Sequence, residues 1–220
     1  MEVDSGLVTP QEETESREPI DFEAMTLKTV LRRFRIGESE ISEAYLLDKI
    51  EHNKSKMDVY YACLGLTLYG TSASIPTLKK LIYYPKQDVK CVAILQIARI
   101  AGSSETAFFT QSLFDKNYPE KGYAIWAIYE AADDSAIPAI LEYFRINRKK
   151  LLNGAMQCET ATYGLVYLYK FRQGRPDIEQ LLREAGANWK PYYAYTHSWR
   201  DKVVQQFMND YYPDLPEKKT

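Results

Sequence analysis

The chain has few of the residues that most often form metal or nucleophilic centres. It contains two histidines and three cysteines among 220 residues. His52 and His197 are not in a His-x-x-x-His arrangement, and no cysteine pair has the Cys-x-x-Cys spacing of a metal site. Cys63, Cys91 and Cys158 fall within apolar helical patterns, where packing explains them. We therefore expect no metal, no cofactor and no catalytic residues, and the sequence favours a protein that is not an enzyme.

Long apolar runs are also missing. No segment reaches the roughly 18 uncharged apolar residues that identify a bilayer-spanning helix. The first residues lack the basic and apolar regions of a secretory signal. Together with the odd number of cysteines, this predicts reduced thiols and a cytoplasmic protein without a membrane segment.

The sequence also lacks strong positive charge. Its formal net charge is −2, and residues 1–24 contain eight acidic side chains but one arginine. Nucleic-acid-binding proteins normally present a broad basic surface, so this balance disfavours a nucleic-acid partner. Residues 1–19 are polar and acidic, and we expect them to be a disordered tail. A single domain is expected over residues 20–220.

What the chain does contain is an internal repeat. The sequence Ser-Ile-Pro-Thr-Leu at 74–78 is matched by Ala-Ile-Pro-Ala-Ile at 136–140, which is 62 positions later. A degenerate third copy, Thr-Ala-Phe-Phe at 106–109, stands halfway between them. The resulting period of about 31 residues is typical of stacked helical hairpins. The clearest repeats cover residues 57–147.

The spacing of apolar residues predicts an all-α fold. Apolar residues recur at intervals of three and four rather than two, which is the helical period. In each repeat, a first helix rich in small apolar residues is expected to end near Gly70, Gly102 or Asp133. A second helix then begins with a small or polar cap, followed in two repeats by proline. The second helices are expected at residues 74–84, 104–114 and 135–146.

The small-polar turn, the Ala/Ser-Ile-Pro opening and the period near 31 resemble HEAT-like repeats of the type first described in phycobilisome lyases. The likeness is clearest from Val59 to Phe144. It implies an α-α superhelix, here a short solenoid of about five helical hairpins with a C-terminal capping helix. In such solenoids the second helices line a concave, partner-facing side. The resemblance does not imply lyase activity, because the repeat occurs in many unrelated binding proteins.

The expected function is therefore protein binding without catalysis, for instance by a stoichiometric inhibitor such as an immunity protein that neutralises a toxin domain. Polar and aromatic residues on the second helices would form the binding surface. Aromatic residues near the C-terminus would add to it, because tyrosine and tryptophan dominate protein interfaces. The expected partner-binding residues are Lys79, Lys80, Tyr83, Gln111, Asp115, Glu142, Tyr143, Arg145, Trp189, Tyr192 and Tyr193.

Two alternatives stay open. The densest basic run, Arg145 to Lys150, would contact phosphate in a nucleic-acid-binding or base-processing protein, since HEAT-like DNA glycosylases exist. Cations at the end of a helix also have a simpler explanation, because they complement its dipole. A chromophore-handling accessory protein is the other alternative. Asp133 and Asp134 are adjacent carboxylates at a helix start, where capping is the favoured interpretation.

Overall fold

The structure is a computed structural model that describes residues 21–53, 55–189 and 201–213. Every regular element within these ranges is helical, so the predicted all-α fold is confirmed for this part of the chain. The predicted tail at residues 1–19, as well as Tyr192 and Tyr193, lies outside the described residues. The α-helices are α1 (Phe22–Phe34), α2 (Glu43–His52), α3 (Lys56–Tyr69), α4 (Ile75–Leu81), α5 (Gln87–Ala101), α6 (Thr106–Phe114), α7 (Lys121–Ala131), α8 (Ile137–Ile146), α9 (Arg148–Leu152), α10 (Cys158–Lys170), α11 (Pro176–Asn188) and α12 (Lys202–Tyr211).

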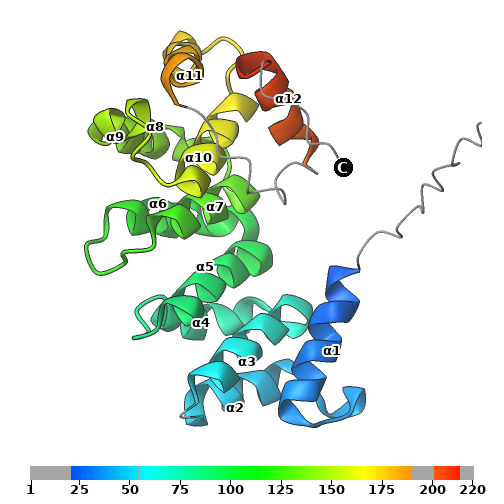
Figure 1. Ribbon diagram of the computed structural model, residues 1–220. Coiled ribbons are helices and arrows are strands. Elements are labelled where there is room, and N and C mark those ends of the chain that lie inside the picture. Colours follow the sequence, from blue (N-terminus) through cyan, green and yellow to red (C-terminus); the bar gives the residue numbers. More distant parts are fainter. Residues whose placement is uncertain (1–20, 54, 190–200, 214–220) are drawn as a thin grey trace, which may run out of the picture.

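The helices are arranged in two layers (Figure 1). Helices α3, α5, α7 and α10 pack one against the next and form the first layer, with α1 against α3 at one end. The second layer consists of α2, α4 and α6, which pack on α3, α5 and α7 respectively, and of α8 and α11, which pack on α10. Helix α12 covers α10 and α11 at the other end.

Three second-layer helices begin at equal intervals. The first residues of α4, α6 and α8 are Ile75, Thr106 and Ile137, which are 31 positions apart. Pro76 and Pro138 stand in the first turn, where a missing N–H leaves no hydrogen bond unmade. Each of these three helices follows a 3₁₀ turn. The starts expected from sequence, at residues 74, 104 and 135, fall within those turns. These turns are η2 (Ser72–Ser74), η3 (Gly102–Glu105) and η4 (Asp134–Ala136).

Two glycines end first-layer helices for different physical reasons. Gly102 follows α5 with φ of 57°, a backbone conformation that residues other than glycine rarely adopt. Gly70 follows α3 with an ordinary φ, but a Cβ at this position would lie 2.6 Å from Cδ1 of Ile100. It would also lie 2.5 Å from the carbonyl oxygen of Leu66. Glycine at position 70 therefore permits α3 and α5 to approach each other closely.

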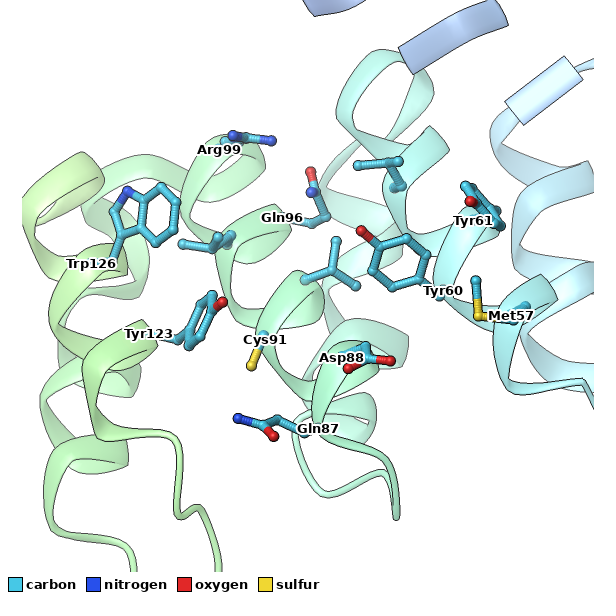
Figure 2. A pocket seen from close by; sticks show the side chains of 13 residues that line it. Met57, Tyr60, Tyr61, Gln87, Asp88, Cys91, Gln96, Arg99, Tyr123 and Trp126 are labelled. Atoms are coloured by element: carbon cyan, nitrogen blue, oxygen red, sulfur yellow. The ribbon is translucent and has the colours of Figure 1, made fainter. Parts of the chain in front are cut away.

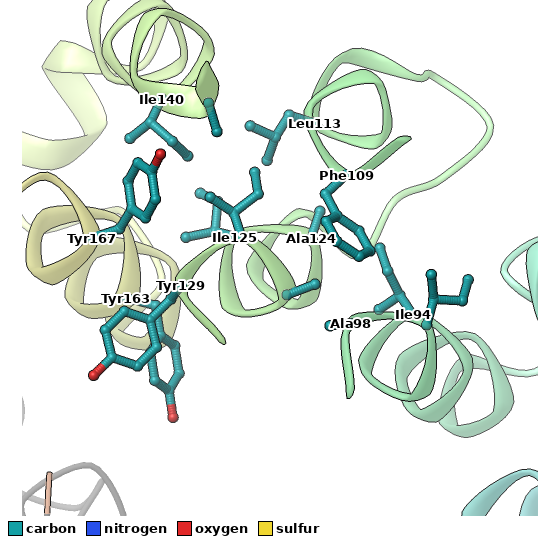
Figure 3. Close-up of a cluster of buried hydrophobic side chains, with 14 of the residues drawn as sticks. Ile94, Ala98, Phe109, Leu113, Ala124, Ile125, Tyr129, Ile140, Tyr163 and Tyr167 are labelled. Carbon is teal, nitrogen blue, oxygen red and sulfur yellow. The ribbon is translucent and has the colours of Figure 1, made fainter. Parts of the chain in front are cut away.

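The buried apolar side chains form one cluster that extends from Val30 to Tyr212. Figure 3 shows how this core joins the layers: Phe109 of α6 points between Ile94 of α5 and Ala124 of α7. Phe109 is completely buried. Since a helical hairpin cannot bury such residues alone, each unit depends on its neighbours for stability.

Two lysines of the first layer donate hydrogen bonds to carbonyl oxygens at the ends of earlier helices. The Nζ atom of Lys121, in α7, donates hydrogen bonds to the carbonyl oxygens of Ser112 and Asp115 at the end of α6. In the same way Lys170, in α10, donates to the carbonyl oxygen of Tyr129 in the last turn of α7 at 2.8 Å. The last carbonyls of a helix have no partner within it, so these contacts satisfy groups that otherwise need water.

Candidate functional site

A groove crosses the outer face of three successive first-layer helices (Figure 2). It has a volume of about 730 Å³. Aromatic side chains stand along it, Tyr60 and Tyr61 on α3 and Tyr123 and Trp126 on α7 (Figure 2). We call it the aromatic groove. It is lined by Met57, Tyr60, Tyr61, Leu64, Gln87, Asp88, Cys91, Val92, Leu95, Gln96, Arg99, Tyr123 and Trp126.

The periodicity of α3 explains its side of the groove. Met57, Tyr60, Tyr61 and Leu64 are spaced by three and four residues, so they share one face of the helix. The opposite face is buried in the core by Val59, Ala62, Cys63 and Leu66. Helix α3 is thus apolar on both sides; one side is fully buried, whereas Tyr60, Tyr61 and Leu64 on the other are half-buried.

The groove combines apolar surface with polar groups that are mostly neutral, and Arg99 is an exposed cation in its lining. Burial raises the pKa of Tyr60 above its ordinary value and raises the pKa of Tyr123 to about 12, so both hydroxyls are uncharged at neutral pH. The side chain of Gln96 is held in place because its Oε1 accepts a hydrogen bond of 2.7 Å from Thr67. Asp88 is neutralised by an ion pair of 2.7 Å with Lys56. Such surfaces suit the mixed side chains of another protein.

Aromatic contacts continue beyond the groove and hold its far wall. The rings of Trp126 and Tyr163 are stacked, with centroids 4.9 Å apart and an interplanar angle of 8°. Trp126 also donates a hydrogen bond of 2.9 Å from Nε1 to Glu130. Tyr129 contacts Tyr163 on the side of α10, with ring centroids 5.3 Å apart. These contacts fix the orientation of Trp126, so this wall is preformed.

The thiols in and near the groove are not activated. Burial raises the pKa of Cys91 to about 12 and also raises the pKa of Cys63. Both therefore remain protonated at neutral pH, and a protonated thiol is a poor nucleophile and metal ligand. Within the described ranges, no group of three or more His, Cys, Asp or Glu side chains is placed to hold a metal ion.

The partner-binding residues predicted on the second helices lie in the second layer, and none of them lines the aromatic groove. Two of them, Tyr83 and Asp115, contact each other across neighbouring units. The hydroxyl of Tyr83, just after α4, donates a hydrogen bond of 2.7 Å to Asp115, just after α6. This bond lowers the pKa of the Asp115 carboxyl and raises the pKa of Tyr83. Lys79 forms an ion pair of 2.7 Å with Glu105, whereas Lys80 and Gln111 are exposed without such contacts in the described structure.

A second hollow lies between α8 and α11, with a volume of about 600 Å³. Of the predicted partner-binding residues, Glu142 and Arg145 line it. They pair with each other, because Arg145 donates from Nε to Glu142 at 2.6 Å. Arg148 lines the same hollow and pairs with Glu184 at 2.8 Å. The predicted basic run is thus partly neutralised by carboxylates of the chain, which weakens it as a phosphate-binding surface. The remaining predicted residue of α8, Tyr143, is half-buried.

Trp189 is in the core, which corrects the sequence-based placement of this residue in an interface. It is 2% exposed, and its ring contacts Tyr212 at a centroid distance of 5.9 Å. A side chain that is covered by its own chain has no surface to offer a partner. Asp133, in contrast, is a cap as predicted: its Oδ1 accepts a hydrogen bond of 3.1 Å from the N–H of Ser135.

Sequence reasoning missed the aromatic groove. Its signal is present, because α3 is apolar on every side and a helix of this kind either is buried all round or has an exposed apolar face. The pattern alone does not distinguish these cases, since it does not tell which neighbours cover the helix.

No family model matches this chain, and no curated protein or solved structure is significantly similar to it. None of the helices in the described part of the chain is both long enough and apolar enough to span a membrane.

Proposed function

We propose that the chain is a HEAT-like repeat protein, a short curved solenoid that binds another protein without catalysing a reaction. The observation that carries this proposal is the aromatic groove, which is preformed by three rigid helices. Large stiff aromatic side chains provide interface area at a small cost in conformational entropy. The equal spacing of α4, α6 and α8 supports the repeat architecture.

Stoichiometric inhibition is the form of binding that we propose, for instance neutralisation of a toxin domain by an immunity protein. A preformed surface loses little freedom on docking, which favours the tight complexes that inhibitors need. The half-buried tyrosines support this role, because each offers a ring to pack and a neutral hydroxyl to donate. In this proposal the aromatic groove is the docking surface. The alternative is that the partner docks on the predicted second-helix residues.

Two matched variants of the full chain distinguish these surfaces. Met57 is 37% exposed at the edge of the groove, and Tyr83 is 50% exposed on the second layer. A protein captured by the tagged chain is purified, and its binding is titrated with wild type, Met57→Glu and Tyr83→Glu. We expect a 1:1 complex in which Met57→Glu weakens the affinity at least ~10-fold, because a buried unpaired carboxylate costs more than 1.4 kcal/mol. Tyr83→Glu should bind like wild type.

Other outcomes contradict the proposal in distinct ways. Weakening by Tyr83→Glu alone would place the docking surface on the second helices. If no purified protein forms a complex of defined stoichiometry, the protein-binding function itself is wrong. Inhibition of the partner's activity by one equivalent of the chain supports the inhibitor role, whereas unchanged activity excludes it.

The nucleic-acid alternative rests on Lys149 and Lys150, which are exposed at the end of the basic run. It predicts binding that weakens with salt, with a logarithmic slope that falls by about one for each phosphate-contacting cation removed. The double variant Lys149→Glu/Lys150→Glu tests this against short DNA and RNA duplexes. Absence of binding by wild type at low salt excludes the alternative.

A further inference from the structure

A third hollow, distinct from the one between α8 and α11, is rich in cations and adjoins the aromatic groove at α1. Its volume is about 450 Å³. Tyr61 lines both this hollow and the groove, so the two surfaces meet at one side chain. We call it the basic hollow. It is lined by Lys28, Thr29, Arg32, Arg33, Arg35 and Tyr61.

Most of the positive charge in the basic hollow is not neutralised. Arg33 pairs with Asp58, to which its Nε donates a hydrogen bond of 2.6 Å. Lys28, Arg32 and Arg35 are exposed and have no carboxylate partner among the residues that the structure describes. Three unpaired cations in a shared hollow produce a positive potential that attracts an anion.

The helix dipole explains only part of this cluster. Arg32 and Arg33 are in the last turn of α1, where cations are favourable. Lys28 lies earlier in the helix, and Arg35 follows it with φ of 55°. Arg35 is the C-cap residue, so the dipole favours it as well, whereas Lys28 lies more than one turn before the end of the helix and is not explained in this way.

The chain carries a matching anionic segment immediately before α1. Residues 1–20 contain six acidic side chains and one arginine. Four of the six are Glu12, Glu13, Glu15 and Glu18, all within nine positions of Asp21, which caps the start of α1. This segment therefore bears a concentrated negative charge at a short tether from the cations.

The tether is long enough for the segment to reach the hollow. Nine residues span up to ~30 Å when extended. Along the helix, Lys28 lies ~10 Å from Asp21 and Arg35 lies ~21 Å from it. An intramolecular ligand on such a short tether has an effective concentration on the order of millimolar. Even a weak multivalent ion-pair contact is substantially populated under these conditions.

We propose that the acidic segment at residues 12–18 binds the basic hollow of the same chain. The contact consists of glutamate carboxylates on Lys28, Arg32 and Arg35, and it places the segment beside Tyr61 at the end of the aromatic groove. A protein that enters the groove at this end then competes with the segment. That competition rests on the proposed function, whereas the contact itself does not.

Zero-length carbodiimide coupling of the full chain tests the contact without any partner. The reagent joins a carboxylate to a lysine amine only when the two groups are in contact, and Lys28 is the only lysine of the hollow. We expect peptides that link Lys28 to Glu12, Glu13, Glu15 or Glu18 by mass spectrometry. The yield should fall severalfold in 1 M salt, where the Debye length is ~3 Å.

A pair of matched variants separates docking from chance encounters near the tether. Arg32→Gln/Arg35→Gln keeps Lys28 and all the carboxylates and adds no new one, but removes two cations, so the link yield should fall severalfold. Lys149→Gln/Lys150→Gln makes the same change in net charge on α9 and should leave the yield unchanged. All four side chains are exposed, so both variants should keep the circular dichroism spectrum of wild type.

Two results overturn the inference. An equal link yield in wild type and Arg32→Gln/Arg35→Gln shows that the coupling reflects proximity in sequence alone. Links between differently isotope-labelled copies in a mixed sample show that the anions come from a second molecule. Because neither measurement involves a partner, failure here leaves the protein-binding proposal standing, and failure to find a partner leaves this contact intact.

Discussion

The outer faces of the two layers are supported by one core but differ in how their surface groups are satisfied. On the second layer, several exposed polar side chains pair with each other, as Arg145 does with Glu142 and Tyr83 with Asp115. On the first layer, half-buried rings such as Tyr60 and Trp126 line an open groove. The two faces therefore differ in how their apolar groups are placed. Half-buried rings converge on one groove in the first layer, whereas the second layer exposes separate apolar side chains such as Phe114 and Ile146.

The largest effect is expected where the layers meet. Phe144 of α8 is completely buried and packs so closely on α10 that a Cβ at Gly164 would lie 2.6 Å from its Cζ. Phe144→Ala should lower the free energy of unfolding by ~3–5 kcal/mol, because it leaves a cavity in the shared core. Urea denaturation followed by circular dichroism and by tryptophan fluorescence measures this.

Ile146→Ala, in the same helix, is the matched control because Ile146 is 58% exposed. It should leave the urea midpoint nearly unchanged. If Phe144→Ala shifted the circular dichroism transition and not the fluorescence transition, the two layers would unfold separately and the idea of one shared core would be wrong.

An intermediate effect is expected at Glu43, which links α2 to the turn of the next unit. Its carboxylate accepts hydrogen bonds from the N–H and hydroxyl of Thr71 and from the hydroxyl of Ser74, and these bonds lower its pKa. Glu43→Gln should reduce the free energy of unfolding by ~1 kcal/mol at pH 7, since hydrogen bonds to charged groups are worth more than neutral ones.

The difference between wild type and Glu43→Gln should depend on pH. A lowered folded-state pKa stabilises the fold above the ordinary value of 4.5, and this contribution is lost as pH falls through the folded-state pKa. Urea midpoints measured from pH 7 down to pH 3 should therefore converge. Glu51→Gln, an exposed position in the same helix, is the control, and a constant difference across this range would contradict the assignment.

The smallest effect is expected on the second-layer surface. Arg145→Ala removes the ion pair with Glu142, in which both side chains face solvent. Exposed pairs of this kind contribute little because water and salt screen them. The urea midpoint should stay within error of wild type, at low salt and at high salt. A loss of unfolding free energy as large as that of Glu43→Gln would mean that ion pairs on the second-layer surface stabilise the fold. The described difference between the two faces would then be wrong.

Local signals in the sequence were sufficient for the repeats. Pro76 and Pro138 mark the first turns of α4 and α8, and Gly102 ends α5 because only glycine readily adopts its φ. These residues act within one turn of chain, so their effects are visible without a structure. The period of 31 residues follows from such signals, and the all-α fold follows from the spacing of apolar residues.

The candidate site was not visible in the same way, because exposure depends on contacts between distant residues. Tyr60 and Trp126 belong to apolar helices that look like core on both sides. Trp189 is the opposite case: it directly follows α11 and the sequence predicts it at the surface, yet it is buried and its ring packs on Tyr212, more than twenty residues later. No local pattern encodes either outcome.

The lysine contacts at helix ends tie two helices to residues that come later in the chain. The carbonyl of Ser112 in α6 accepts a hydrogen bond from Lys121 of the next repeat, and the carbonyl of Tyr129 in α7 accepts one from Lys170. A growing chain that stopped at the boundary of a sequence repeat would leave each last turn facing water. The cooperative unit therefore overlaps the next repeat, and fragments cut at repeat boundaries should fray at their C-terminal ends.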